Sequence, residues 1–420
     1  MFKMAFRSLF RYGKRTAITV FAISIGVALA IFTKGVLIGV DLDSTRNLIK
    51  YETGGAKVFP KGYFEDMKYF PVDKFIENEE KEEIFKKISE LDKDIKFTGE
   101  FISSGEVMFY EDPFPASGSV KAIIHTLPYN QEVYEINKDN LEGSWLEKNS
   151  DEVVIGSKLA DDMKAKIGYY LTIQSRGRDG FLQAFDVKIG GILNTGNPVI
   201  DASAVYVDMD FADSLFELNG GVNSIVFNWG NDIVQTINQT TEKVSIIRAI
   251  ASSLGDFETY DWEDLSSDLI ALQKTKDASS GILLFFLFII ATVGITNTML
   301  MAVSERKNEI AMLRALGYKG SYIKSLFAIE GGLIGAIGAI CGAILGLLIV
   351  WPCKVYGIDF SSLMGDMDIG YRINAIMYAA IDMKSIILIV LFAFGVSVLS
   401  AWIAVRHSSK GEISEIMRRI

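Results

Sequence analysis

The sequence has very little cysteine and histidine, and both absences exclude classes of function. The two cysteines, Cys341 and Cys353, lie in or beside one apolar run, so residues 41–277 contain no disulfide framework. The two histidines, His125 and His407, are far apart and have no cysteine nearby. Zinc sites use clusters of cysteine and histidine, and a hydrolytic triad needs a histidine beside a serine and an acid. We therefore expect no metal site and no catalytic residues.

Nucleotide-binding motifs are absent as well. No segment fits G-x-x-x-x-G-K-[ST], no G-x-G-x-x-G follows a predicted strand, and neither H-E-x-x-H nor Cys-x-x-Cys occurs. A P-loop holds phosphates with backbone N–H groups and a lysine, so a chain without this motif cannot bind ATP in that manner. We expect a non-catalytic protein that holds no cofactor of its own.

Charges of the two signs are separated along the chain. Residues 41–277 hold 43 acidic and 24 basic residues, whereas the whole chain has a net charge of −10. The basic residues outside this stretch flank apolar runs. A domain this acidic repels phosphate backbones, which argues against nucleic acid as a partner.

Long apolar runs are what the sequence does contain. Half of all residues are hydrophobic, and four runs have the roughly 20 residues that a helix needs to cross a bilayer. A cleaved signal peptide is the alternative for the first run, since Ala28-Leu29-Ala30 resembles a cleavage site. That run continues to Val40, however, so we expect a retained span. The predicted spans are residues 16–40, 281–303, 323–351 and 386–405.

Lysine and arginine near the span ends predict the orientation in the membrane. Three segments are basic, and we therefore expect them in the cytoplasm: residues 1–15, the segment 304–320 and the tail 406–420. Residues 1–15 are predicted to form an amphipathic helix on the membrane surface. Residues 41–277 and the loop 352–384 then lie outside. The fold class is a membrane protein of four transmembrane α-helices with a large α/β extracytoplasmic (periplasmic) domain inserted between helices 1 and 2.

The outer stretch alternates between helical and strand patterns and is expected to form two lobes. Phe75–Leu91 repeats apolar residues at helical spacing, and residues 95–110 and 120–126 have strand patterns. Ser157 is expected to N-cap a helix that follows a strand at 152–155. The further predicted elements are a hairpin across residues 176–180, strands at 204–207 and 224–229, and helices at 211–218 and 241–253.

The helical pattern of residues 266–277 runs directly into the second span, and a continuous helix there would form a stalk below the outer domain. Charged residues inside the spans are few. Lys34 is expected to snorkel to the interface, with a contact to substrate as the alternative, and Glu330 is expected to be structural. Glycines recur every four residues in the third span, which lets helix backbones approach closely. The predicted packing residues are Gly331, Gly335, Gly338, Gly342 and Gly346.

The segment Ser304–Gly317 is charged and helical and lies between two apolar runs. Gly317 is placed to end this helix in a left-handed cap, and Ser321 to begin the next one. A charged loop that only turns between spans is the alternative, but such a loop does not need apolar residues on the cytoplasmic side. We expect a coupling helix that docks in a groove of a partner. Its contact residues are predicted to be Glu305, Arg306, Glu309, Ile310, Leu313, Arg314, Leu316 and Gly317.

This segment resembles the FtsX-like permeases of ABC transporters, the class of MacB and LolC/LolE. Their pattern places an asparagine in the second span, then E-R-x-x-E-I-x-x-L-R-A-L-G, then Glu-Gly at the third span; Asn297, Glu305–Gly317 and Glu330-Gly331 match it in order. The tail after Ser409 lacks the proline that family members often have, so no role is carried over to it.

The resemblance implies a dimer of permeases, with a second copy of this chain or a related one, and a separate ABC ATPase dimer that binds ATP and Mg²⁺. It implies mechanotransmission in a bacterial inner membrane, with contacts to membrane lipid and to a lipoprotein substrate or another periplasmic partner. Lipoprotein release of the LolC/LolE kind is the function expected first. The alternatives are drug or peptide efflux of the MacB kind and FtsX-like signalling to a cell-wall enzyme.

Overall fold

The chain divides into two compact units. The structure, a computed structural model, describes residues 13–111, 114–136, 140–230, 232–306, 312, 316–359 and 376–408. The helical unit comprises the described residues within Met1–Asp41, Gln273–Asp359 and Met377–Ile420, and the α/β unit those within Leu42–Leu272 and Phe360–Ile376. Helices α2 (Gly13–Leu48) and α9 (Ser267–Glu305) each contribute residues to both units.

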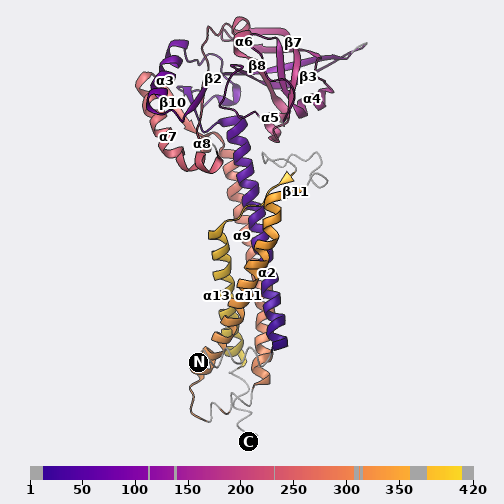
Figure 1. The fold of residues 1–420 in the computed structure, drawn as a ribbon, viewed down its shortest axis with the longest axis vertical. Coiled ribbons are helices and arrows are strands. Elements are labelled where there is room, and N and C mark those ends of the chain that lie inside the picture. The colour runs from indigo at the N-terminus through magenta and orange to yellow at the C-terminus, as the bar shows by residue number, and fades with distance from the viewer. Residues whose placement is uncertain are drawn as a thin grey trace. The chain divides into compact units, whose positions relative to one another are not determined.

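The helical unit contains α2, α9, α11 (Gly320–Tyr356) and α13 (Met383–Ser408), which lie side by side in Figure 1. Among the residues described, three helices are long and apolar enough to cross a membrane: Thr16–Thr53, Gly320–Tyr356 and Met383–Ala404. The predicted span 281–303 lies within α9, where several side chains fall outside the description, so this span stays a prediction. Two short strands, β11 (Ile358–Asp359) and β12 (Ile376–Met377), lie between α11 and α13.

The helices of this unit are longer than the apolar runs that predicted them. Helix α11 extends beyond both ends of the predicted span 323–351 and contains Pro352. Helix α2 continues past Val40 to Leu48. The prediction ended each span where the apolar residues end, but helical hydrogen bonds continue into polar sequence wherever no residue breaks them.

Glycines of α11 bring it into close contact with two other helices. A Cβ atom added at Gly342 would lie 2.7 Å from both the Ser24 carbonyl oxygen and the Val27 Cβ atom of α2. On the side facing α13, a Cβ atom at Gly335 would lie 2.3 Å from the Ser397 Cβ atom. The Ser24 hydroxyl donates a 3.0 Å hydrogen bond to the Gly338 carbonyl, so the two helices also share a polar contact. Gly331 and Gly346 are likewise buried.

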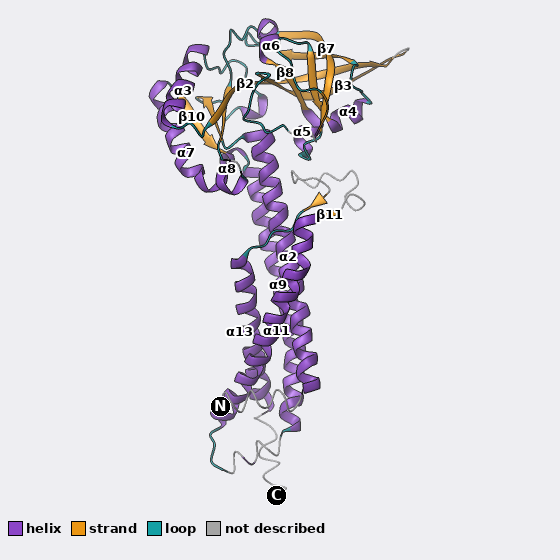
Figure 2. Ribbon diagram, in the orientation of Figure 1, coloured by secondary structure: helices purple, strands orange, loops and turns teal. Residues whose placement is uncertain are grey.

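The α/β unit is built on a ten-stranded sheet in the order β10-β1-β9-β2-β3-β8-β5-β7-β4, with β6 paired to both β2 and β7. Figure 2 shows helices α3 and α7 beside the strands at one end of this sheet. The strands are β1 (Ala56–Pro60), β2 (Lys96–Glu111), β3 (Phe114–Leu127), β4 (Leu141–Gly143), β5 (Glu152–Gly156), β6 (Tyr170–Arg176), β7 (Leu182–Leu193), β8 (Ala204–Asp208), β9 (Ser224–Asn228) and β10 (Phe257–Asp261). The helices are η1 (Ile49–Thr53), η2 (Met67–Tyr69), α3 (Asn78–Leu91), α4 (Ser157–Met163), α5 (Pro198–Ser203), α6 (Met209–Phe216), α7 (Ile233–Leu254) and α8 (Trp262–Leu265).

Strand β2 belongs to two parts of the sheet. Its residues 96–100 pair with β9, and its residues from Phe101 onward pair with β3. One hydrophobic core packs Ile84 and Ile88 of α3 and Ile247 of α7 against β1 and β9. A second core lies among β2, β3, β5, β6, β7 and β8 with α4 and α6. The single strand that both parts share therefore joins two separately packed regions.

In the α/β unit several predicted elements are confirmed, and one predicted helix cap is wrong. Strands β6 and β7 pair from Tyr170 to Arg176, as the hairpin prediction required. Ser157 is the first residue of α4, however, and Gly156 holds the N-cap position without a capping side chain. A Cβ atom at Gly156 would lie 2.3 Å from the Asp201 carbonyl oxygen, so close packing against α5 decides the residue there. The prediction missed β1, β4, β10, α5 and α8.

A buried ionic cluster lies at the point where β2 passes between the two parts of the sheet. Glu100 is fully buried and accepts hydrogen bonds from Lys57 Nζ at 3.1 Å, His125 Nδ1 at 2.5 Å and the Tyr134 hydroxyl at 3.0 Å. Burial alone would raise the pKa of Glu100, but Lys57 and His125 outweigh it and hold this pKa at about 2. Burial and the neighbouring Glu100 raise the pKa of Tyr134, so its hydroxyl stays protonated and donates.

The close contact of α11 with α2 predicts a difference between two glycine substitutions. Gly342→Leu forces the two backbones apart and should cost about 1–3 kcal/mol or more by overpacking. Gly395→Leu on α13 is the matched control, because an added Cβ there meets nothing within 4 Å. The measurement is thermal unfolding of the full chain in mild detergent. Equal unfolding temperatures for the two variants would contradict the packing described here.

The ionic cluster predicts a pH dependence that one variant removes. The pKa of Glu100 is lower in the folded protein than its ordinary value of 4.5, so its stabilising contribution is complete above pH 4.5 and is lost as the pH falls towards about 2. Glu100→Gln should abolish this loss and, because Lys57 stays buried without its anionic partner, destabilise the protein by about 3–5 kcal/mol at neutral pH.

Tryptophan fluorescence during thermal unfolding of the full chain at several pH values measures both effects. Glu106→Gln is the control, since Glu106 lies on the same strand but is exposed. A variant at Glu100 that keeps the wild-type acid dependence would show that another group is responsible.

Candidate coupling site

The turn between α9 and α11 is closed by a buried ion pair. Arg306, the residue after the end of α9, places Nη1 2.9 Å from Oε2 of Glu330, and the two side chains are only 14% and 9% exposed. Hydrogen bonds between charged groups are shorter and stronger than those between neutral ones. Glu330 therefore fixes the end of α9 against α11, which agrees with the structural role predicted for it.

The position of Glu330 along α11 determines where the ion pair attaches α9 to α11. Glu330 lies ten residues after Gly320, or about 15 Å along the helix. The Arg306 guanidinium also lies over the Phe327 ring, with its Cζ atom 5.6 Å from the ring centroid. The carboxylate and the ring, one turn apart, hold the arginine from two directions, so α9 is attached well inside α11 rather than at its tip.

Apolar side chains project from the turn itself. Leu316 is 70% exposed, Met312 is 63% exposed, and Tyr318 is exposed as well. The Leu316 N–H donates to the Met312 carbonyl at 3.0 Å, and Gly317 follows at φ +85°. Gly317 thus adopts the left-handed conformation that favours glycine after a helix. Three apolar side chains in solvent at one turn are a surface suited to burial by a partner.

The predicted contact residues are only partly within the description. Glu305, Arg306, Leu316 and Gly317 lie at the turn as stated, whereas Glu309, Ile310, Leu313 and Arg314 lie outside the described residues. One detail is wrong: Ser321 does not begin the next helix. Helix α11 starts at Gly320 with Lys319 as its N-cap and no capping side chain. The first turn of α11 therefore forms without the serine cap that the sequence suggested.

At the other end of the helical unit, two ion pairs join α2 to α9. Lys34 Nζ lies 2.9 Å from Asp277 Oδ1, and Lys276 pairs with Asp41 and donates to the Leu37 carbonyl at 3.0 Å. Lys34 was expected to snorkel; the structure shows it bound to an acid on the neighbouring helix. The prediction missed these contacts, and the opposite charges at corresponding ends of the two apolar runs were the signal that could have found them.

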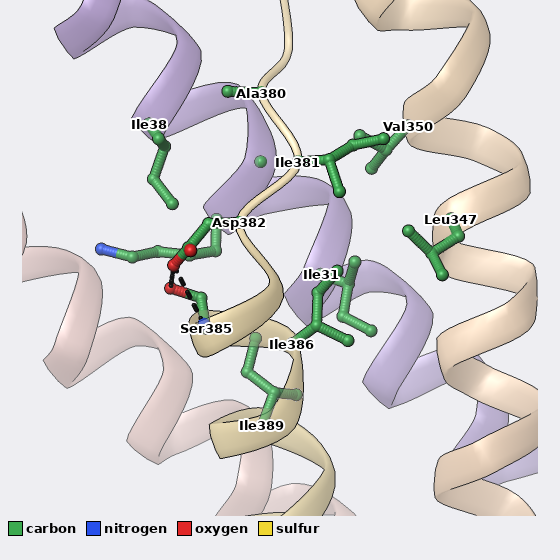
Figure 3. Close-up of a pocket in the computed structure, with 12 residues that line it drawn as sticks. Ile31, Ile38, Leu347, Val350, Ala380, Ile381, Asp382, Ser385, Ile386 and Ile389 are labelled. Atoms are coloured by element: carbon green, nitrogen blue, oxygen red, sulfur yellow. Dashed lines mark hydrogen bonds between the residues drawn. The ribbon is translucent and has the colours of Figure 1, made fainter. Parts of the chain in front are cut away.

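A small cavity lies between α2, α11 and the start of α13, near the ion pairs of Lys34 and Lys276 (Figure 3). Ile31, Leu347 and Ile386 converge on it, and Asp382 lies at its edge, where it accepts hydrogen bonds from the Ser385 N–H at 2.9 Å and the Ser385 hydroxyl at 2.6 Å. The cavity volume is about 10 Å³, close to the space that a single water needs. It is too small for a drug-sized ligand, so the side chains here serve packing and helix capping.

The described residues also bear on metal chemistry. Within them, no three histidine, cysteine or acidic side chains are grouped so that they could hold a metal ion. His125, the one histidine with a described side chain, is committed to Glu100 in the α/β unit.

Several known proteins resemble parts of this chain. Residues 281–413 match the family model described as FtsX-like permease C-terminal. An uncharacterized ABC transporter permease of Methanocaldococcus jannaschii is 27% identical over 321 residues, 72% of this chain and 72% of that protein. The lipoprotein-releasing system transmembrane protein LolC of Neisseria meningitidis is 22% identical over 276 residues, 64% of this chain and 65% of that protein.

Two further likenesses cover less. The macrolide export ATP-binding/permease protein MacB of Campylobacter jejuni is 26% identical over 226 residues, 51% of this chain, and the match spans only 34% of that protein. The crystal structure of the periplasmic region of MacB from Actinobacillus actinomycetemcomitans matches 53% of this chain and 95% of that region, with 14% identity and a TM-score of 0.34. Residues 281–413 therefore resemble an FtsX-like permease domain, and the chain as a whole is similar to ABC transporter permeases, LolC and MacB proteins among them.

Proposed function

We propose that the protein is the membrane subunit of an ATP-driven complex and that a separate ABC ATPase dimer docks on the segment 304–320. The observation that carries the proposal is the turn between α9 and α11, where Leu316 and Met312 are exposed and Arg306 forms a buried ion pair with Glu330. Exposed apolar residues supply the contact, and the buried pair supplies a rigid attachment. ATP and Mg²⁺ would be bound by the partner, because the sequence contains no P-loop.

Orientation follows from the basic residues at the ends of the apolar runs. In this proposal the turn and both termini face the cytoplasm of a bacterial inner membrane, and the α/β unit works outside it. A second permease, identical or related, completes the complex. Membrane lipid surrounds the helical unit.

Helix α9 offers a direct mechanical connection. It runs without a break from Ser267 to Glu305, and a helix of 39 residues is about 58 Å long. One end belongs to the α/β unit and the other ends beside Arg306. A push on the coupling turn would be carried through this helix as a displacement, so ATP hydrolysis could act on a substrate without a pore through the membrane.

Lipoprotein release is the substrate assignment we favour. A lipoprotein-releasing protein matches 64% of this chain, more than the 51% matched by the macrolide exporter, whose name includes an ATP-binding part. Efflux of small molecules or peptides, and signalling to a cell-wall enzyme, use the same membrane machinery and differ in what the α/β unit binds.

The docking assignment predicts that one exposed leucine matters for coupling. Leu316→Asp places a charge in the apolar contact and should reduce stimulation of the partner ATPase by at least tenfold, while the exposed position leaves the fold intact. Leu91→Asp is the matched control, because Leu91 on α3 is 68% exposed and Leu316 is 70% exposed. ATPase assays with the reconstituted permease measure the effect.

The buried pair of Arg306 and Glu330 supplies a second variant for the ATPase assay. Arg306→Ala should bind the ATPase but stimulate it weakly, since the turn is then detached from α11. Normal stimulation by both the Leu316 and the Arg306 variants would remove the docking proposal.

The substrate assignment has its own test. The permease and its ATPase, reconstituted in vesicles that carry a fluorescent triacylated lipoprotein, should release this lipoprotein to a soluble acceptor when ATP is added. A non-hydrolysable ATP analogue is the control. Strong ATPase stimulation without any lipoprotein release would exclude this substrate and leave the coupling mechanism standing.

A further inference from the structure

Strand β2 has an unpaired edge in the middle of the α/β sheet. Its residues 96–100 pair with β9 on one side. On the other side, pairing with β3 begins only at Phe101, opposite Thr126. Strand β3 ends at Leu127, and the loop that begins at Pro128 is not a strand. In the part of the chain that the structure describes, no strand pairs with this side of residues 96–100.

The direction of the backbone groups of residues 96–100 can be worked out from a neighbouring contact. The Ile102 N–H donates to Asn223 Oδ1 at 2.8 Å, and the Ile102 carbonyl accepts from Asn223 Nδ2 at 2.7 Å. Asn223 directly precedes β9, so Ile102 directs its backbone groups to the β9 side. Backbone groups alternate along a strand, so every second residue points the same way. Phe97 and Gly99 therefore direct their N–H and carbonyl groups to the unpaired side, where the Gly99 carbonyl accepts a 3.4 Å hydrogen bond from the Thr98 hydroxyl and keeps one lone pair for a further donor.

A groove of about 480 Å³ lies along this edge. Phe85 of α3 stacks on Phe97 with 4.4 Å between ring centroids, and Met209 of α6 and Gln131 of the loop after β3 also line the groove. Lys81 lies across from Gly99, where an added Cβ would be 3.1 Å from the lysine Cδ atom. The volume falls within the roughly 300–1,000 Å³ typical of ligand sites.

We propose that this groove binds an extended peptide segment of a partner protein as an added strand on β2. An extended peptide presents N–H and carbonyl groups with the same two-residue repeat as Phe97 and Gly99, which neither an acyl chain nor a sugar does. A large apolar side chain of the peptide would rest on the Phe85 and Phe97 rings beside Met209. The charged residues that line the groove are two lysines and two glutamates, Lys81, Lys96, Glu82 and Glu132. Their charges balance, so backbone hydrogen bonds and shape, and not net charge, would select the peptide.

This inference depends on the α/β unit alone. It would stand if the ATPase docked elsewhere, and the coupling mechanism would stand if the groove stayed empty. The failure of one proposal can therefore be told from the failure of the other.

The experiment uses the full chain in lipid nanodiscs and a phage-displayed library of random dodecapeptides. Peptides enriched over empty nanodiscs are synthesised, and their affinities are measured by fluorescence anisotropy. Phe97→Pro removes the outward N–H group, at a position where an edge strand tolerates proline. Phe97→Val is the matched control, because it loses the ring but keeps the N–H group. We expect Phe97→Pro to bind at least tenfold more weakly than Phe97→Val.

A second readout needs no variant and so does not depend on the folding of Phe97→Pro. Single N-methyl groups placed along a bound peptide should weaken binding at alternate positions, since only every second N–H faces β2. Tolerance at every position, equal binding by the two Phe97 variants, or no enrichment over empty nanodiscs would each overturn the proposal. Self-association of the chain that Phe97→Pro abolishes, without peptide enrichment, would assign the groove to a second copy and overturn it as well.

Discussion

The helical unit depends on the absence of side chains along one face of α11. Lipid is as apolar as leucine, so helices in a membrane gain little from burying apolar surface against each other, and shape complementarity has to hold them together. At Gly338, Gly342 and Gly346 the α2 helix approaches so closely that an added Cβ would lie 2.7–3.0 Å from its nearest atoms. Gly335 does the same towards α13. Helix α11 thereby becomes the fixed element against which the others are positioned.

The proposed coupling mechanism uses that fixed element. Arg306 attaches the end of α9 to Glu330 of α11, and at the other end Lys34 and Lys276 of α2 and α9 hold acids on the opposite helix. The ion pair at Arg306 is buried, whereas Asp277 is about half exposed and its pair with Lys34 is screened by solvent. The pair of Lys276 with Asp41 is only 15% and 23% exposed, so each end of the helical unit has one largely buried ion pair, and the far end has an exposed pair as well.

Sequence reasoning worked where one local pattern decides the outcome. Apolar length predicted α2, α11 and α13, and the ordered motif from Glu305 to Gly317 predicted the likeness to FtsX-like permeases. It failed where partners are distant in the chain. Lys57, Glu100, His125 and Tyr134 come from four separate segments, so no spacing rule could join them. Gly156 is a glycine because α5, a helix that the prediction missed, packs against it.

The ionic cluster also fixes the register of β2 in the sheet. A slip of β2 by one residue along β9 would turn every side chain to the opposite face. Glu100 would then leave Lys57 and His125 and face the helix that covers Gly99, while Phe101 would enter a polar pocket. Apolar residues can exchange places with small losses, but a buried lysine without its acid cannot be accommodated cheaply. Strand β2, which two packed regions share, can therefore resist a pulling force along its length without a shift in register. Any shifted register would separate Lys57 from Glu100.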